Sequence, residues 1–100
     1  MSQPIFKIVL FRSMKEAYYH LTEDEQKKLW DKVMDGIKKN GVKIHGQYDC
    51  RWSNDRYESF VLMEYPDTQA LIKEIANATE AGLFRYVESE TILGIEQKEG

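Results

Sequence analysis

The sequence predicts an α+β domain whose elements follow one another as β-α-β-β-α-β. Three observations lead to this prediction. Two segments carry apolar residues at helical spacing, which indicates amphipathic helices. Between them, two alternating runs flank a polar turn and indicate a β-hairpin over residues 42–65. One apolar run precedes the first helix and another follows the second, so two crossovers should place both helices on one face of a four-stranded antiparallel sheet.

The first strand is predicted over residues 4–12, where only Lys7 interrupts a run of apolar side chains, so both of its faces should be covered. The first helix should begin at Thr22, whose hydroxyl can cap it while Glu25 reaches back in a capping box. Asn40-Gly41 should end this helix. Its apolar side consists of Leu29, Trp30, Val33, Met34 and Ile37.

The hairpin is expected to turn tightly at residues 53–56. One face then holds Val42, Ile44, Gly46, Tyr48 and Cys50 against Val61, Met63 and Tyr65, and the helices should cover it. The other face pairs His45 with Glu64, Gln47 with Leu62, Asp49 with Phe60, and Arg51 with Glu58. Large apolar side chains mixed with titratable ones are typical of a ligand cavity or a subunit interface.

Asp67 or Thr68 should cap the second helix. Ala81-Gly82 should bend or break it before a last strand over residues 88–96. The buried stripe of this helix is predicted to be Leu71, Ile72, Ile75 and Ala76.

The composition indicates a single domain over residues 1–100, since a chain of this size builds one core. With 14 basic and 17 acidic residues and no basic stripe, nucleic-acid binding is disfavoured. No signal sequence or membrane-spanning run is recognisable, so we expect a cytoplasmic protein. Cys50 is the only cysteine and gives no sign of an oxidising compartment.

Covering one face of the sheet with helices leaves the other face bare. That face would expose Phe60, Leu62 and half of the first strand, which a two-layer domain cannot do without aggregating. We therefore expect a homodimer.

The element order, the chain length, the long second strand (residues 42–52) and the bent second helix ending in Leu83-Phe84-Arg85-Tyr86 resemble the dimeric α+β barrel superfamily, whose subunits are ferredoxin-like. Within it, the chain is most similar to small darcynin-like proteins in Tyr48-Asp49, Tyr18-Tyr19-His20-Leu21-Thr22 and Ile92-Leu93-Gly94-Ile95-Glu96. Those proteins tend to carry an acidic residue two places after that Asp, whereas Arg51 stands there in this chain. The resemblance implies two sheets facing each other as a barrel. It also implies that a small molecule is bound or converted in the enclosed space, by ring isomerisation, polyketide cyclisation, cofactor-free oxygenation, or haem binding and degradation.

His45 and Glu64 form the first candidate catalytic pair. A carboxylate that accepts a hydrogen bond from one imidazole nitrogen raises the basicity of the other, as a general base near neutral pH requires. The alternative is a surface ion pair, and burial in a dimer would favour the functional interpretation. Asp49 is the third catalytic candidate, because Phe60 opposite it cannot satisfy a carboxylate. The alternative for Asp49 is a position at the sheet margin, within reach of water.

Substrate contacts are expected from the connection before the first helix, where a loop can overhang a cavity mouth. It carries Tyr18, Tyr19 and His20, and a Tyr hydroxyl there could donate to a developing enolate, the alternative being packing against the helix. Arg51 either holds an anion or forms a simple salt bridge with Glu58. The remaining predicted substrate contacts are Phe60 and Leu62.

Three function hypotheses remain open. The first is a cofactor-independent enzyme of isomerase, cyclase or monooxygenase type, acting on a small cyclic or aromatic compound with His45 as acid/base. The second is a non-catalytic protein that holds haem or a small hydrophobic ligand, with His45 or His20 as axial ligand. The third is a structural or regulatory module that uses its open face only for assembly. The spacing of the His and Cys residues matches no closed zinc site, so no metal is expected. The face assignments depend on the hairpin register, because a slip of one residue would exchange all of them.

Overall fold

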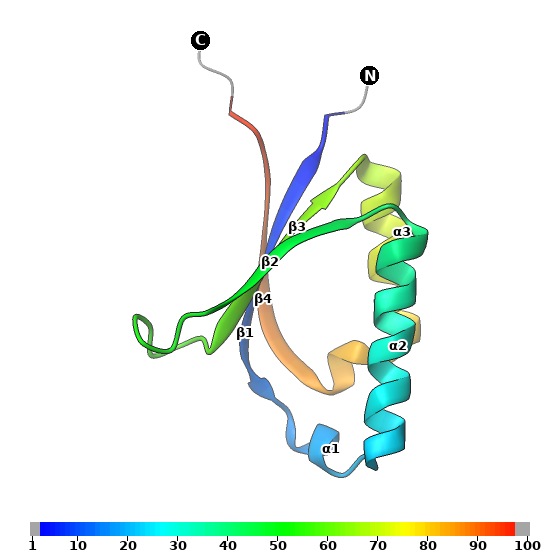
Figure 1. The fold of residues 1–100 in the computed structure, drawn as a ribbon, viewed down its shortest axis with the longest axis vertical. Helices are drawn as coiled ribbons and strands as arrows, with labels where there is room; N and C mark the ends of the chain where they lie inside the picture. Colours follow the sequence, from blue (N-terminus) through cyan, green and yellow to red (C-terminus); the bar gives the residue numbers. More distant parts are fainter. Residues whose placement is uncertain (1–2, 98–100) are drawn as a thin grey trace.

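The structure is a computed structural model that describes residues 3–97 (Figure 1). Its strands are β1 (Ile5–Met14), β2 (Lys43–Asp49), β3 (Ser59–Tyr65) and β4 (Val87–Ile95). Its helices are α1 (Glu16–Tyr19), α2 (Glu23–Lys39) and α3 (Thr68–Glu80), followed by a 3-10 turn, η1 (Leu83–Arg85). The predicted order is confirmed, with the short α1 added in the connection before α2.

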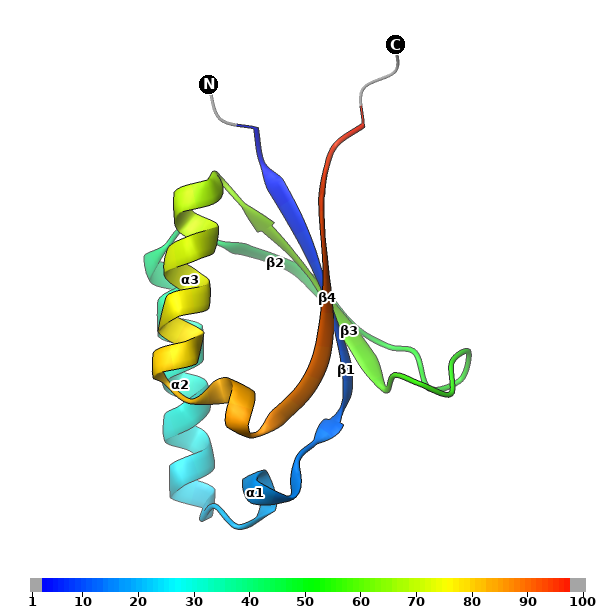
Figure 2. The ribbon, with the colours of Figure 1, turned by 180° about the vertical axis from the view of Figure 1, so that it is seen from behind.

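The four strands form one antiparallel sheet in the order β2-β3-β1-β4. Helices α2 and α3 pack beside each other over one side of it (Figures 1 and 2). We call this side the helix face; it includes Val9, Val61 and Met63. The opposite side, the open face, includes Leu10 and Leu62 and is not covered by any element of the described chain. This two-layer arrangement is the predicted ferredoxin-like fold.

The helix ends form where local sequence signals place them. Thr22 and Glu25 make both hydrogen bonds of the capping box, at 3.1 and 2.9 Å. Gly41, with φ of +69°, follows the end of α2 in the left-handed region that glycine tolerates. The Asp67 side chain caps α3 by accepting a hydrogen bond from the Ala70 N–H at 2.8 Å.

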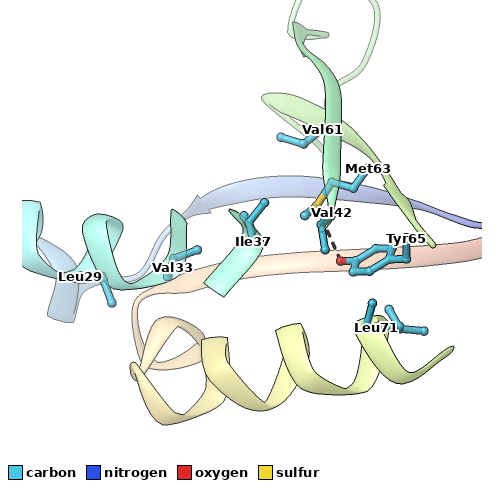
Figure 3. Close-up of a cluster of buried hydrophobic side chains, with 9 residues drawn as sticks. Leu29, Val33, Ile37, Val42, Val61, Met63, Tyr65 and Leu71 are labelled. Atoms are coloured by element: carbon cyan, nitrogen blue, oxygen red, sulfur yellow. Dashed lines mark hydrogen bonds between the residues drawn. The ribbon is translucent and has the colours of Figure 1, made fainter. Parts of the chain in front are cut away.

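The hydrophobic core lies between the helices and the helix face (Figure 3). The predicted stripe of α3 was mostly wrong, because only Leu71 is buried, whereas Ile72, Ile75 and Ala76 are exposed and Glu74 is buried instead. Glu74 points inward because Lys7 of β1 lies there and forms an ion pair with it. The core consists of Leu29, Val33, Ile37, Val42, Val61, Met63, Tyr65, Ala70 and Leu71.

The predicted hairpin register was wrong by one residue over most of β2. Tyr48 pairs with Phe60, and Asp49 pairs with Ser59. The register shifts between Ile44 and Gly46, so the chain bulges at His45. Beyond this bulge, Gln47 and Asp49 turn to the helix face and Tyr48 turns to the open face. Packing favours this register, because the rings of Tyr48 and Phe60 stack with centroids 4.9 Å apart.

The connection between β2 and β3 is longer than the predicted four-residue turn. It spans residues 50–58 and projects away from the helices (Figure 1). The Cys50 N–H donates to the Glu58 carbonyl at 3.0 Å, so Cys50 is a half-buried loop residue rather than part of the core. Trp52, in the same connection, is 87% exposed.

Candidate functional site

A buried ion pair joins the two layers of the domain. Lys7, near the start of β1, and Glu74 of α3 are only 8% and 5% exposed, and Lys7 Nζ lies 3.3 Å from Glu74 Oε1. Lys and Glu are rarely buried, because removing two charges from water costs several kcal/mol per ion. A buried ion pair beside a cavity therefore needs an explanation other than the packing of the core.

Tyr65 completes this polar cluster. It is fully buried, and its hydroxyl donates a hydrogen bond to Glu74 Oε1. Lys7 Nζ lies 5.4 Å from the centroid of the Tyr65 ring. Burial, reinforced by the Glu74 carboxylate, raises the pKa of Tyr65 far above its ordinary value, so the hydroxyl stays protonated and remains a donor. Among the described residues, Glu74 Oε2 accepts no hydrogen bond, which leaves it available to a ligand.

An inner cavity of about 280 Å³ lies against this cluster, between the sheet and the helices. Lys7 and Glu74 are part of its lining, whereas most of the other lining side chains are apolar and come from α2, α3 and the helix face. Ligand sites in proteins are typically of this kind, mostly apolar with a few placed polar groups. The polar cluster therefore faces a space that can hold a small molecule.

An outer cavity of about 600 Å³ adjoins the inner one near the ends of β1 and β2. Its lining includes Asp49 and Arg51, so the structure separates these two residues from His45, with which they were predicted to share a face. Arg51 donates to Asp49 from Nε at 3.2 Å and from the terminal nitrogen at 2.8 Å. These bonds, with one from the Arg51 backbone, lower the pKa of Asp49 to about 2. The predicted pairs Asp49–Phe60 and Arg51–Glu58 were wrong, because the β2–β3 connection spans residues 50–58 and places Asp49 opposite Ser59.

His45 and Glu64 do meet as predicted, with His45 Nε2 2.8 Å from Glu64 Oε1. They lie on the open face, where His45 stacks on Phe6 with ring centroids 6.1 Å apart. The bulge keeps His45 on this face although its neighbours along β2 change sides. The side chains are 40% and 23% exposed, and neither residue lines the inner or outer cavity. In one copy of the chain this pair has the geometry of a surface ion pair.

The other predicted contacts are dispersed. Tyr18 is half-buried and packs on Trp30 and Tyr86, whereas Tyr19 is 69% exposed and His20 carries only a solvent-exposed contact to Glu16. None of the three predicted residues on this connection lines either cavity. Phe60 and Leu62 lie on the open face.

Sequence reasoning missed Lys7 and Glu74, although a signal for each existed. Lys7 interrupts a strand with both faces covered, and a lysine in that position needs a partner. Glu74 stands three residues after Leu71 and four before Ala78, which is the spacing of one helix face. Lys7 was noted only as an interruption of the first strand and Glu74 was not singled out; the fold shows that the two side chains meet.

The chain offers no histidine ligand for haem at these cavities. Its two histidines are His20, on the α1–α2 connection, and His45, on the opposite face of the sheet. Histidine-ligated haem, which the resemblance to the superfamily implies as one alternative, therefore does not fit the inner cavity. Within residues 3–97, no group of three His, Cys, Asp or Glu side chains is placed to hold a metal ion. Nor is any helix in this range both long and apolar enough to span a membrane.

Comparison with known proteins identifies the fold. No family model and no curated protein matches the sequence, so the finer likeness to darcynin-like proteins stays a prediction. Among solved structures, a variant chlorite dismutase from Candidatus Nitrospira defluvii superposes with a TM-score of 0.73 at 13% identity, over 99% of this chain and 42% of that one. A Rhodopseudomonas palustris protein of unknown function gives 0.67 at 18% identity, over 99% and 86% of the two chains.

SnoaB, a cofactor-independent oxygenase from Streptomyces nogalater, gives a TM-score of 0.54 at 12% identity, over 98% of this chain and 97% of that one. This chain spans about two fifths of the length of the chlorite dismutases that it matches. At these identities the likeness concerns the fold alone. The chain has the ferredoxin-like fold of the dimeric α+β barrel proteins.

Proposed function

We propose that this protein binds a small, largely apolar molecule in the inner cavity and transfers a proton on it without a cofactor. One observation carries this proposal: the Lys7–Glu74 ion pair, with the Tyr65 hydroxyl, is buried at the wall of an apolar cavity. Stability alone does not account for such a pair, since apolar residues of similar volume are often as stable or more so.

The roles follow from the geometry. Glu74 Oε2 is the base that takes a proton from a weakly acidic C–H or O–H group of the ligand and returns it at another position, so that an isomerisation balances. Lys7, 3.3 Å from the other oxygen of Glu74, offsets the negative charge that develops on the ligand. Tyr65 holds Oε1 of Glu74 in place through its hydroxyl hydrogen bond. The mostly apolar lining of the cavity lowers the local dielectric constant, which strengthens these interactions.

The comparisons support cofactor-free chemistry to a limited degree, since one protein of the same fold, SnoaB, is a cofactor-independent oxygenase. For this chain the proposal includes only proton transfer, which needs no oxidant. The compound class predicted from the sequence, small and cyclic or aromatic, is compatible with the size of the inner cavity.

A homodimer remains part of the proposal. The open face presents an apolar surface that a second copy would cover, with Phe6, Ile8, Leu10, Phe60, Leu62 and Ile92 on it. Such a dimer would also enclose the His45–Glu64 pair. The 2.8 Å contact of this pair and the bulge that directs His45 to the open face favour it as a second candidate site.

A matched pair of substitutions distinguishes the two sites. Naphthol is the probe, and its own fluorescence reports binding. We expect Glu74→Gln, which removes the charge and keeps the shape, to weaken binding at least about tenfold, because a hydrogen bond to a charged group contributes about 1.5–3 kcal/mol. The same change on the open face, Glu64→Gln, should leave binding unaltered. The reverse result would move the site to the open face, and no binding by the unaltered protein would leave assembly as its function.

A further inference from the structure

The two cavities share one wall. Phe11, Gln47 and Val61 of the sheet and Trp30 of α2 line both of them. The Trp30 indole is fixed at this junction, because its Nε1 donates to the Tyr18 hydroxyl at 2.9 Å and Tyr18 packs against its ring.

The two ends of the combined space differ in chemistry. Lys7 and Glu74 stand in the apolar inner cavity, whereas Ser13, Asp49 and Arg51 give the outer cavity a polar lining. Along β1, four residue steps lead from Lys7 to the junction at Phe11, and two more lead to Ser13. At about 3.3 Å per residue, these steps place the two polar ends roughly 20 Å apart.

We propose that the two cavities form one channel past Trp30, and that its ligand is an elongated molecule with an apolar middle and a hydrogen-bonding group at each end. One end meets Glu74 and Lys7, the middle lies against Trp30 and Phe11, and the other end meets the polar outer cavity. This inference rests on the proposed function and extends it, because it defines the shape and polarity of the molecule on which the inner cluster acts.

The test uses hexanediol, decanediol and tetradecanediol, each with a hydroxyl at both ends, and calorimetry to measure affinity. In a Trp52→Phe background Trp30 is the only tryptophan, so its emission reports on the junction. We expect affinity to rise at least about tenfold from hexanediol to tetradecanediol, because each added methylene is buried. The Trp30 emission should shift to shorter wavelength as the longer diols displace water from the junction.

Ser13→Phe narrows the outer cavity only, since Ser13 lines that cavity and not the inner one. It should reduce the affinity for tetradecanediol at least about tenfold and leave hexanediol unchanged. The matched control is Ser53→Phe on the exposed β2–β3 loop, which should change neither affinity.

The outcomes separate this inference from the proposed function. If naphthol binds but diol affinity does not depend on length, or Ser13→Phe has no effect on tetradecanediol, the channel is refuted while the inner site stands. If neither naphthol nor any diol binds, both proposals fail.

Discussion

The two faces of the sheet each carry a carboxylate paired with a basic side chain, in opposite environments. On the helix face, Lys7 and Glu74 are almost entirely buried and share a hydrogen-bond network with Tyr65. On the open face, His45 and Glu64 approach more closely, at 2.8 Å, yet both remain within reach of solvent. The distance between the charged groups therefore does not show which of the two pairs is the stronger interaction.

The comparison shows that burial decides what an ion pair can do. Water screens the open-face pair, so its contribution to stability is small in a single copy of the chain. The helix-face pair has lost that screening, so removal of either partner is costly and each charge acts strongly on anything beside it. A second copy of the chain on the open face would bury His45 and Glu64 and so reduce the difference in solvent exposure between the two pairs.

The largest expected effect comes from breaking the buried pair. Glu74→Ala should lower the free energy of unfolding by about 3–5 kcal/mol, because Lys7 is left buried and unpaired. Glu64→Ala on the open face should cost no more than about 1 kcal/mol. Urea unfolding measures both. The double variant Lys7→Met, Glu74→Leu should recover most of the loss, and equal losses from the two single variants would contradict the comparison.

The next effect concerns the covering of the open face. Leu62→Glu should raise the dissociation constant of the proposed homodimer by roughly 100-fold, because a carboxylate would be buried in the interface. Ile72→Glu, on the exposed side of α3, is the control and should change nothing. Analytical ultracentrifugation over a range of concentrations checks both. A wild-type protein that stays monomeric would refute the dimer.

Tyr65→Phe should have a smaller effect on the helix face, with a loss of about 1–3 kcal/mol, since Glu74 loses one donor in a buried site. The matched change is Tyr57→Phe, which removes a hydroxyl that donates to Glu90 at 2.5 Å in an exposed setting. Thermal unfolding should show the larger loss for Tyr65→Phe. The opposite ranking would mean that burial does not set the strength of these bonds.

The smallest effect is a pH dependence at the outer cavity. Hydrogen bonds from Arg51 hold the pKa of Asp49 at about 2, below its ordinary 3.8. The stabilisation is therefore complete above about pH 4 and is lost as the pH falls through the folded value. A carboxyl NMR titration should show this midpoint, and Arg51→Gln should return it towards the ordinary value. A midpoint near 4 in the unaltered protein would contradict the bidentate contact.

Local signals in the sequence were sufficient to predict most of the helices and strands of the fold. The capping box at Thr22, the left-handed Gly41 and the Asp67 cap act within a few residues, so short segments predict them correctly. The candidate site depends on contacts between distant residues. No short segment indicates that Lys7 meets Glu74, 67 positions away. The prediction of the hairpin register failed because the β2–β3 connection is longer than the predicted four-residue turn and because β2 bulges at His45, neither of which the alternating pattern indicates.

The bulge at His45 also makes the two outer strands of the sheet unequal. A strand that joins a sheet edge needs an unbroken row of backbone N–H and C=O groups. At β2 the bulge interrupts the regular backbone pattern at one residue. In contrast, β4 runs for nine residues and carries the exposed side chains of Ile92, Leu93 and Ile95. Sheet extension is therefore expected along β4 only. Because one regular edge per molecule allows two molecules to pair and no more, we expect the bulge to limit open-ended extension of the sheet.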